Sequence, residues 1–235
     1  FTVESSKIEE LEVMAASGET TSLMKSVDTR TITVSVATAV DQSAVMAIVD
    51  ALSTMEVDKV IDDNPTGLAS FGLEPVRYSV AFKVSGDATL HRLNVGSKTP
   101  TGSDVYARVD GQNRLFLTLA THDETLNRTT FDLRDKRVLA FSRDGVDSVS
   151  LAGKGAPGLT LARTGGDWKL TAPVQARADF SPVDGLIGRL DQVHMLAIVS
   201  EGTEPTAAQL KTYGLDTPQM VATLGAGSTK ATLAI

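Results

Sequence analysis

Three histidines and the complete absence of cysteine limit the metal and nucleophile chemistry open to this sequence. His91, His122 and His194 are scattered, and no pair has the close helical spacing that a zinc site requires. Without cysteine, the chain has no thiol nucleophile, no thiolate zinc site and no iron–sulfur ligand. No serine lies in the G-x-S-x-G turn of hydrolases. We therefore expect a non-enzymatic protein with no catalytic residue, no cofactor and no metal site.

Residues 153–158 imitate a dinucleotide-binding fingerprint, because they read Gly-Lys-Gly-Ala-Pro-Gly and so fit G-x-G-x-x-G. That fingerprint requires a helix after the last glycine, whose N-terminus receives the pyrophosphate. Residues 159–162, Leu-Thr-Leu-Ala, instead alternate as a strand does. A hairpin turn is therefore the favoured interpretation, and nucleotide binding is the minor alternative.

The segment after residue 61 imitates the first half of a calcium-binding loop. Asp62, Asn64 and Thr66 stand at alternate positions before Gly67. The bidentate glutamate that should complete such a loop is missing, because Leu73 stands at its position. We interpret the segment as a polar loop, with a weak cation site as the alternative.

Two groups of side chains are candidates for contact with another macromolecule. Tyr106 and Arg108 alternate with apolar residues, so they share one face of a predicted strand. Tyrosine and arginine are frequent at the centres of protein interfaces. A half-buried sheet face explains the pair equally well.

The second group is the basic cluster Arg134, Lys136 and Arg137 around Asp135. The simplest interpretation is a solvated face or local ion pairs. The alternative is a contact with an anionic partner or with lipid headgroups.

Composition and charge exclude several classes of protein. The 235 residues include 22 Lys or Arg and 29 Asp or Glu, which gives a net charge of −7. This acidic excess argues against a nucleic-acid binder, which usually presents a basic face. Hydrophobic residues make up 42% and charged residues 22% of the chain, as in ordinary globular proteins. No apolar run reaches the roughly 18 residues of a membrane-spanning helix.

An internal repeat organises the chain. Residues 31–55 resemble residues 169–193, and Asp41 matches Asp179 at an offset of 138 (179 − 41). Further on, Phe-Gly-Leu-Glu-Pro at 71–75 matches Tyr-Gly-Leu-Asp-Thr-Pro at 213–218, at an offset of 142 (213 − 71). The sequence therefore predicts two tandem copies of one module.

Each copy predicts three short strands followed by one amphipathic helix. Asp41 and Asp179 are the expected N-caps of the helices, with Ser181 before Pro182 as an alternative cap. Apolar residues then recur at the spacing of a helix that packs one face against a sheet. An irregular polar segment, a short helical turn and another strand follow. The strands are expected at 8–14, 21–24, 31–36 and 77–84, and at 146–151, 159–162, 168–171 and 220–224; the polar segments are 58–66 and 200–206.

The first copy continues into a β-rich extension, roughly residues 82–141. It contains an alternating stretch at 90–95, a hairpin of residues 105–109 and 114–119, and a helical piece near Glu124. We expect this extension to join both modules in one continuous sheet. The expected fold class is α+β, with two tandem modules, each an antiparallel meander packed on one amphipathic helix. The expected modules are 1–142 and 143–235, the second shortened at its C-terminus.

The sequence resembles the domain of unknown function 4340 family. The resemblance rests on four segments in family order, which together cover most of the chain. They are the stretch Trp168, Leu170, Pro173, Ala178, Asp179; the corner Gly72, Leu73, Glu74, Pro75 with its copy Gly214, Leu215, Asp216, Pro218; the stretch Leu93, Val95, Gly96, Pro100, Gly102, Tyr106, Ala107, Arg108; and the run Phe131 to Lys136.

The resemblance implies a location outside the bacterial cytoplasm, behind an N-terminal membrane helix or lipid anchor. It also implies association with ABC-type transport systems, including those linked to gliding motility. Because the chain opens at Phe1, we expect that an upstream segment has been removed. The expected function is a non-enzymatic interaction or scaffolding module whose partners are proteins such as transporter subunits.

Two other functions remain open. The first is a soluble ligand-binding protein with a small-molecule or glycan site between the repeats, which would need an apolar pocket with a few convergent polar groups. The second is an uncharacterised hydrolase, which would need clustered titratable groups with perturbed pKa values.

Overall fold

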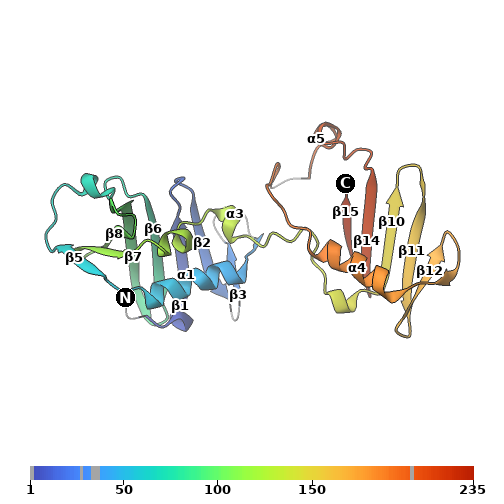
Figure 1. Ribbon diagram of the computed structural model, residues 1–235, viewed down its shortest axis with the longest axis horizontal. Coiled ribbons are helices and arrows are strands. Elements are labelled where there is room, and N and C mark those ends of the chain that lie inside the picture. The colour runs from blue at the N-terminus through green and yellow to red at the C-terminus, as the bar shows by residue number, and fades with distance from the viewer. Residues whose placement is uncertain (1–2, 27–28, 33–37, 202–203) are drawn as a thin grey trace. The chain divides into compact units, whose positions relative to one another are not determined.

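The computed structural model describes residues 3–26, 29–32, 38–201 and 204–235. The chain divides into two compact units, Phe1–Asp135 and Lys136–Ile235, which we call the first and the second unit. Each unit consists of one antiparallel sheet with a long helix across one face (Figure 1). The α+β class and the organisation in two sheet-based modules are confirmed.

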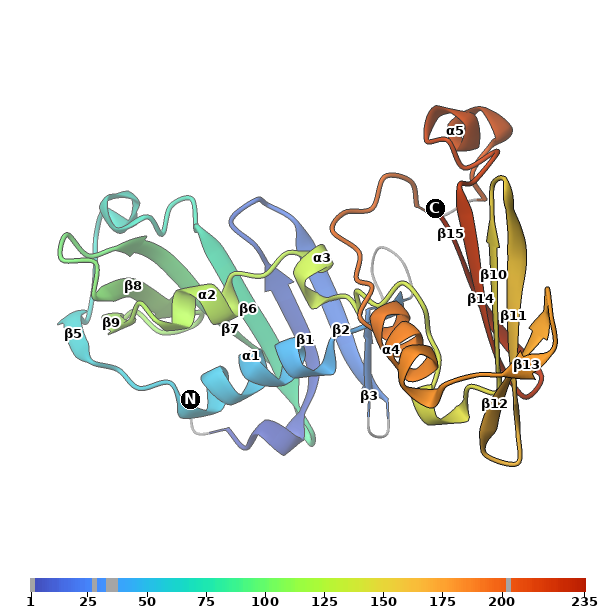
Figure 2. The same ribbon diagram turned by 45° about the vertical axis from the view of Figure 1, so that its right-hand side comes forward.

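The sheet of the first unit has nine strands in the order β4-β3-β2-β1-β6-β7-β8-β9-β5. Strand β6 returns to pair with β1, so the extension adds to the meander within one sheet (Figure 2). The strands are β1 (Ile8–Met14), β2 (Thr20–Ser26), β3 (Thr29–Ile32), β4 (Thr38–Ala39), β5 (Lys59–Asp62), β6 (Tyr78–Val84), β7 (Asp87–Lys98), β8 (Asp104–Val109) and β9 (Leu115–Leu119).

Helix α1 (Gln42–Thr54) covers the apolar face of this sheet. Its N-cap is Asp41, as predicted, because the Asp41 carboxylate accepts hydrogen bonds from the backbone N–H groups of Ser43 and Ala44. The predicted apolar stripe is buried against strand residues that alternate inward along the sheet. The buried stripe consists of Val45, Ile48, Val49 and Leu52, and the strand residues that it joins include Leu11, Val13, Val80, Phe82 and Leu93.

The sheet of the second unit has six strands in the order β13-β12-β11-β10-β14-β15. Residues 154–155 form the turn between β10 and β11, so the hairpin interpretation of the glycine-rich segment is confirmed. The elements are β10 (Ser148–Gly153), β11 (Ala156–Thr164), β12 (Asp167–Ala172), β13 (Ala176–Arg177), α4 (Phe180–Asp191), β14 (Met220–Ala226) and β15 (Thr229–Ala234).

Short helices complete both units. A helical turn precedes each Gly-Leu corner, and another lies near Glu124, as predicted. No helix within the described part of the chain is long and apolar enough to cross a membrane. These short elements are η1 (Ser5–Lys7), η2 (Leu68–Phe71), α2 (His122–Leu126), α3 (Thr130–Leu133), η3 (Arg143–Gly145) and α5 (Ala207–Thr212).

The strand registers show that the two units are copies of one fold. Leu11 of β1 lies opposite Phe82 of β6, and Val149 of β10 lies opposite Leu224 of β14. These pairs are related by the same offsets of 138 (149 − 11) and 142 (224 − 82) that the sequence repeat shows. Strands β6 and β7 therefore correspond to β14 and β15. Strands β8, β9 and β5 have no counterpart among the described residues of the second unit.

The expectation of one continuous sheet is wrong. The strands form two separate sheets, because the extension ends on β5 of its own unit rather than on a strand of the second unit. The segment 58–66, expected to be irregular, contains β5. All four residues of β5 are exposed, so the strand shows no alternation that a sequence pattern could reveal.

The boundary between the units differs from the predicted position. The units divide between Asp135 and Lys136 rather than after residue 142. The backbone N–H of Val138 donates to the Val193 carbonyl, and Leu139 is buried in the second core, which ties this segment to the second unit. Strand β3 ends at Ile32, and residues 33–36 of the predicted strand lie outside the described residues.

Candidate functional site

Strand β8 carries the predicted pair of interface residues. Tyr106 and Arg108 lie on one face, while Val105, Ala107 and Val109 point into the core. The Tyr106 ring packs on Phe71, with the ring centroids 4.9 Å apart at an interplanar angle of 59°. Both side chains of the pair are half-buried. The structure brings the two residues together, and their role in binding a partner stays a prediction.

Charged side chains on the neighbouring strands neutralise one another. Arg92 of β7 lies 2.8 Å from a carboxylate oxygen of Glu12 on β1 and 3.7 Å from one of Asp110. Lys83 of β6 pairs with Glu10 of β1 at 2.7 Å. These contacts join charged side chains across the face of the sheet. The paired groups therefore offer little net charge that would select an ionic partner.

The basic cluster after α3 is divided between the two units. Arg134 belongs to the first unit, where it forms a β-bridge with Val40. Lys136 and Arg137 belong to the second unit: the Lys136 carbonyl accepts a hydrogen bond from Met195, and Arg137 forms a β-bridge with His194. Near neighbours in the sequence are thus held by different units. Binding of an anionic partner by these three residues stays a prediction.

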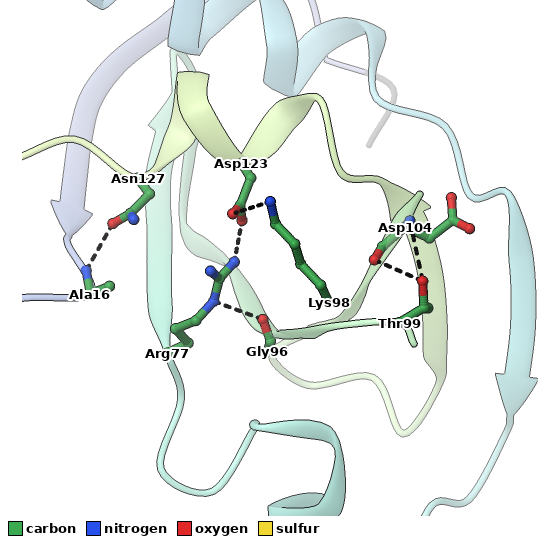
Figure 3. A network of polar contacts seen from close by, with 8 residues as sticks. All are labelled: Ala16, Arg77, Gly96, Lys98, Thr99, Asp104, Asp123 and Asn127. Atoms are coloured by element: carbon green, nitrogen blue, oxygen red, sulfur yellow. Dashed lines mark hydrogen bonds and ion pairs between the residues drawn. The ribbon is translucent and has the colours of Figure 1, made fainter. Parts of the chain in front are cut away.

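A buried acid, for which the sequence indicated only a place in the first turn of a helix, lies in α2. Asp123 is 8% exposed, and the guanidinium of Arg77 and the Nζ of Lys98, 3.7 Å away, converge on its carboxylate (Figure 3). The Arg77 Nε also donates to the Gly96 carbonyl at 2.9 Å. In the sequence Asp123 is simply an acid in the first turn of a helix, which the helix dipole favours. Its partners are too distant in the chain for a local pattern to reveal.

Tyr78 shares this cluster. Burial raises the pKa of the Tyr78 hydroxyl far above its ordinary value, and the negative charge and hydrogen bond of Asp123 raise it further. The hydroxyl therefore stays protonated and holds its place beside Asp123. The arrangement fixes α2 to strands β6 and β7.

The Gly-Leu corner of the first unit is a packing motif. Gly72 has φ +69°, and a Cβ atom there would meet Ser97 of β7, whose backbone N would be 2.7 Å away. A Cβ atom at Gly96 would overlap the Phe71 carbonyl oxygen. The corner can therefore approach β7 only because both positions are glycine. Its copy, Gly214, has φ +73° and open space around it.

The second unit exposes apolar side chains at the end of its sheet. Met220 of β14 and Ile235 exchange two backbone hydrogen bonds of 3.1 and 2.9 Å, and their side chains are 39% and 54% exposed. The equivalent pair in the first unit is Tyr78 and Val95, which are 1% and 0% exposed.

Two of the three histidines, His91 and His194, make local contacts. His91 pairs with Asp87 at 3.2 Å and stacks on Phe82, and the His194 ring contacts the Gln192 carbonyl. Asp62 accepts a hydrogen bond from the Asn64 backbone within the polar loop. Over the described ranges, no group of three or more His, Asp or Glu residues is placed to hold a metal ion.

Hollows occur within each unit. One lies at the end of α1 between Lys7, Met55 and Val84, and another lies beside Trp168 and Phe180. The alternative of a ligand site between the repeats stays a prediction.

Comparison with known proteins gives one match. A family model described as Domain of unknown function (DUF4340) matches residues 31–169 and again residues 168–235. The two matched segments begin 137 residues apart (168 − 31), at β3 and at its counterpart β12, in agreement with the repeat. No curated protein and no solved structure matches the chain.

Proposed function

The chain belongs to the family described as Domain of unknown function (DUF4340), and on that premise we propose that it is a non-enzymatic interaction module. Its task is to hold a protein partner rather than to convert a substrate. The resemblance noted in the sequence supports a place outside the bacterial cytoplasm, in a membrane-anchored protein that accompanies an ABC-type transport system.

The observation that carries this proposal is the face of β8 that holds Tyr106 and Arg108. Both side chains are half-buried, and they stand on the side of the strand opposite to the core residues Val105, Ala107 and Val109.

The side chains of this face are suited to contact with a protein. Tyr106 is half-buried beside Phe71, and the Arg108 Nε donates to the Gln112 carbonyl at 2.9 Å. Both residue types gain much from desolvation in an interface. The neighbouring charges are already paired, so recognition there would depend on shape and hydrogen bonds.

Co-purification of the protein from membranes of its source cells tests the proposal. We expect transporter subunits to be recovered with the wild-type protein, as measured by quantitative mass spectrometry. With the variant Tyr106→Ala/Arg108→Ala, we expect roughly tenfold less partner to be recovered, because the two side chains act as a hot spot of the interface.

The matched control is Lys211→Ala/Tyr213→Ala, which removes one tyrosine and one base from exposed positions in and after α5 of the second unit. This control should recover as much partner as the wild type. Recovery of no protein partner by the wild type would contradict the proposed function, and equal losses in both variants would contradict the role of β8.

A further inference from the structure

We propose that Arg108 selects a partner protein that presents a carboxylate, so that the side chain facing Arg108 in the complex is an aspartate or a glutamate. The inference rests on the proposed function and deepens it, because it names the chemistry that the face of β8 recognises. It depends on the partners that the charged side chains around Arg108 already have within the first unit.

Arg108 differs in its contacts from the other Lys and Arg side chains of strands β6, β7 and β8. The others each lie beside a carboxylate from a different element. These pairs are Lys83 with Glu10 at 2.7 Å, Arg92 with Glu12 at 2.8 Å, and Lys98 with Asp123 at 3.7 Å. No carboxylate among the residues that the structure describes forms an ion pair with Arg108. Arg108 therefore carries the positive charge that these strands can offer to a partner.

The nearest acid along the chain, Asp110, is already occupied. The Asn94 side chain donates to one carboxylate oxygen of Asp110 at 2.5 Å, and the Arg92 guanidinium lies 3.7 Å from the other oxygen. Asn94 is the residue of β7 directly opposite Arg108. The acid that could neutralise Arg108 is therefore held by side chains of β7.

The turn after β8 fixes one side of the Arg108 guanidinium. Its Nε donates to the Gln112 carbonyl at 2.9 Å, and the backbone N–H of Gln112 donates to the Val109 carbonyl at 3.1 Å. Within the described part of the chain, no group accepts a hydrogen bond from the two terminal nitrogens of Arg108. These nitrogens can donate side by side to both oxygens of one carboxylate, which is the strongest pairing of an arginine with an acid.

A single carboxylate suits this surface better than an anionic membrane does. Attraction to lipid headgroups requires several basic residues close together, whereas the bases nearest to Arg108 on the sheet are neutralised by acids. Arg108 is also half-buried. An ion pair becomes stronger where part of the surrounding water is excluded, so a protein that covers this face would gain from an acid at this position.

Tyr106 determines what lies beside that acid. It precedes Arg108 by two residues on the same face of β8, which is roughly 7 Å along the strand. Its ring packs on Phe71 with the ring centroids 4.9 Å apart, so the two rings offer an apolar surface. The segment of the partner that binds here therefore combines an acid with an apolar side chain at about this spacing.

Zero-length cross-linking on membranes of the source cells tests the proposal with the variant Arg108→Lys. This variant keeps the positive charge and supplies a primary amine, which a water-soluble carbodiimide joins to a carboxylate that lies in ion-pair contact with it. Mass spectrometry of the purified product identifies both residues of the new amide. We expect an amide between position 108 and an Asp or Glu of the recovered partner.

The matched control is Arg114→Lys, because Arg114 lies 3.0 Å from Asp63 of its own chain. In this variant the amide should join position 114 to Asp63 and not to the partner. Charge reversal gives a second measurement. Arg108→Glu should lower the recovery of the partner at least about tenfold, because two acids would then face each other in the interface. Arg114→Glu should keep the recovery within about twofold, because an exposed ion pair contributes little.

Circular dichroism establishes that each variant is folded before its recovery is compared. Three results would overturn the proposal: position 108 is joined to an acid of its own chain such as Asp110, the partner is recovered without an amide at position 108, or Arg108→Glu recovers as much partner as the wild type. In the last two cases, recovery by the wild type would leave the proposed function in place and remove only this inference. Recovery of no protein by the wild type would remove both.

Discussion

Tyr78 and Val95 in the first unit and Met220 and Ile235 in the second occupy the same places in two copies of one fold. The first pair is completely buried and the second pair is exposed. The cause lies in the elements around them. In the first unit, β8 and β9 extend the sheet and α2 places Asp123 against Tyr78, whereas β15 is the edge strand among the described residues of the second unit.

The repeat therefore fixes the positions of the strands but not how deeply equivalent residues are buried. One pair of equivalent helix positions shows it as well: Ile48 is fully buried in α1, and its counterpart Leu186 is only partly buried in α4. Residues inside a core lose more when truncated than residues at its margin, because their surroundings cannot relax into the space. The comparison therefore predicts that the first unit is the more sensitive one at equivalent positions.

The largest expected effect comes from truncating the equivalent core residues Phe82 and Leu224. Phe82→Ala should lower the free energy of unfolding of the first unit by about 3–5 kcal/mol, and Leu224→Ala should lower that of the second by about 2–3 kcal/mol. Far-UV circular dichroism follows both units, and the single tryptophan, Trp168, reports on the second. Leu196→Ala, at an exposed position, is the control and should change neither. A larger loss of unfolding free energy in Leu224→Ala than in Phe82→Ala would contradict the prediction that the first unit is the more sensitive one.

The next largest difference between the units is expected at the two corner glycines, Gly72 and Gly214. Gly72→Ala and Gly214→Ala both place alanine at a positive φ, which costs about 1–2 kcal/mol. Only at Gly72 would the new methyl group also meet backbone, which should add about 1–3 kcal/mol. Thermal unfolding of each variant measures the difference. Equal losses in the two variants would show that the close approach to β7 is unimportant.

Alkaline pH should destabilise the first unit through Tyr78. The pKa of Tyr78 is raised in the folded state above the ordinary 10.0, so the stability that its protonated form contributes is complete below that value. As the pH rises past it, the unfolded chain ionises and the folded chain does not, and the first unit loses stability. Tyr78→Phe should reduce this loss. Denaturant titrations across the alkaline range measure it, and an equally steep loss followed by Trp168 would contradict the assignment to the first unit.

The smallest effect concerns the two helix caps. Asp41 accepts hydrogen bonds from two backbone N–H groups, and Asp179 accepts one, from Ser181. Loss of a cap costs about 0.5–2 kcal/mol, so we expect Asp41→Ala near the upper end and Asp179→Ala near the lower end. Urea unfolding measures both. The matching asparagine variants serve as controls and should keep most of the stability, since asparagine also caps helices.

Local patterns predicted those features that neighbouring residues determine. The caps Asp41 and Asp179, the helix stripes and the hairpin after β10 all follow from a few adjacent residue types. The pairing of Tyr106 with Arg108 on one face followed from alternation alone. Strand β5 escaped detection, because its four side chains are exposed and its pairing with β9 joins distant parts of the chain.

The repeat, the α+β class and the order of the main strands and helices followed from the sequence, because hydrophobic periodicity and capping act over a few residues. Only the tertiary structure decided that β6 pairs with β1, that the two sheets are separate, and that Asp123 receives Arg77 and Lys98. These outcomes depend on contacts between residues far apart in the chain, and burial is a property of those contacts rather than of any single residue.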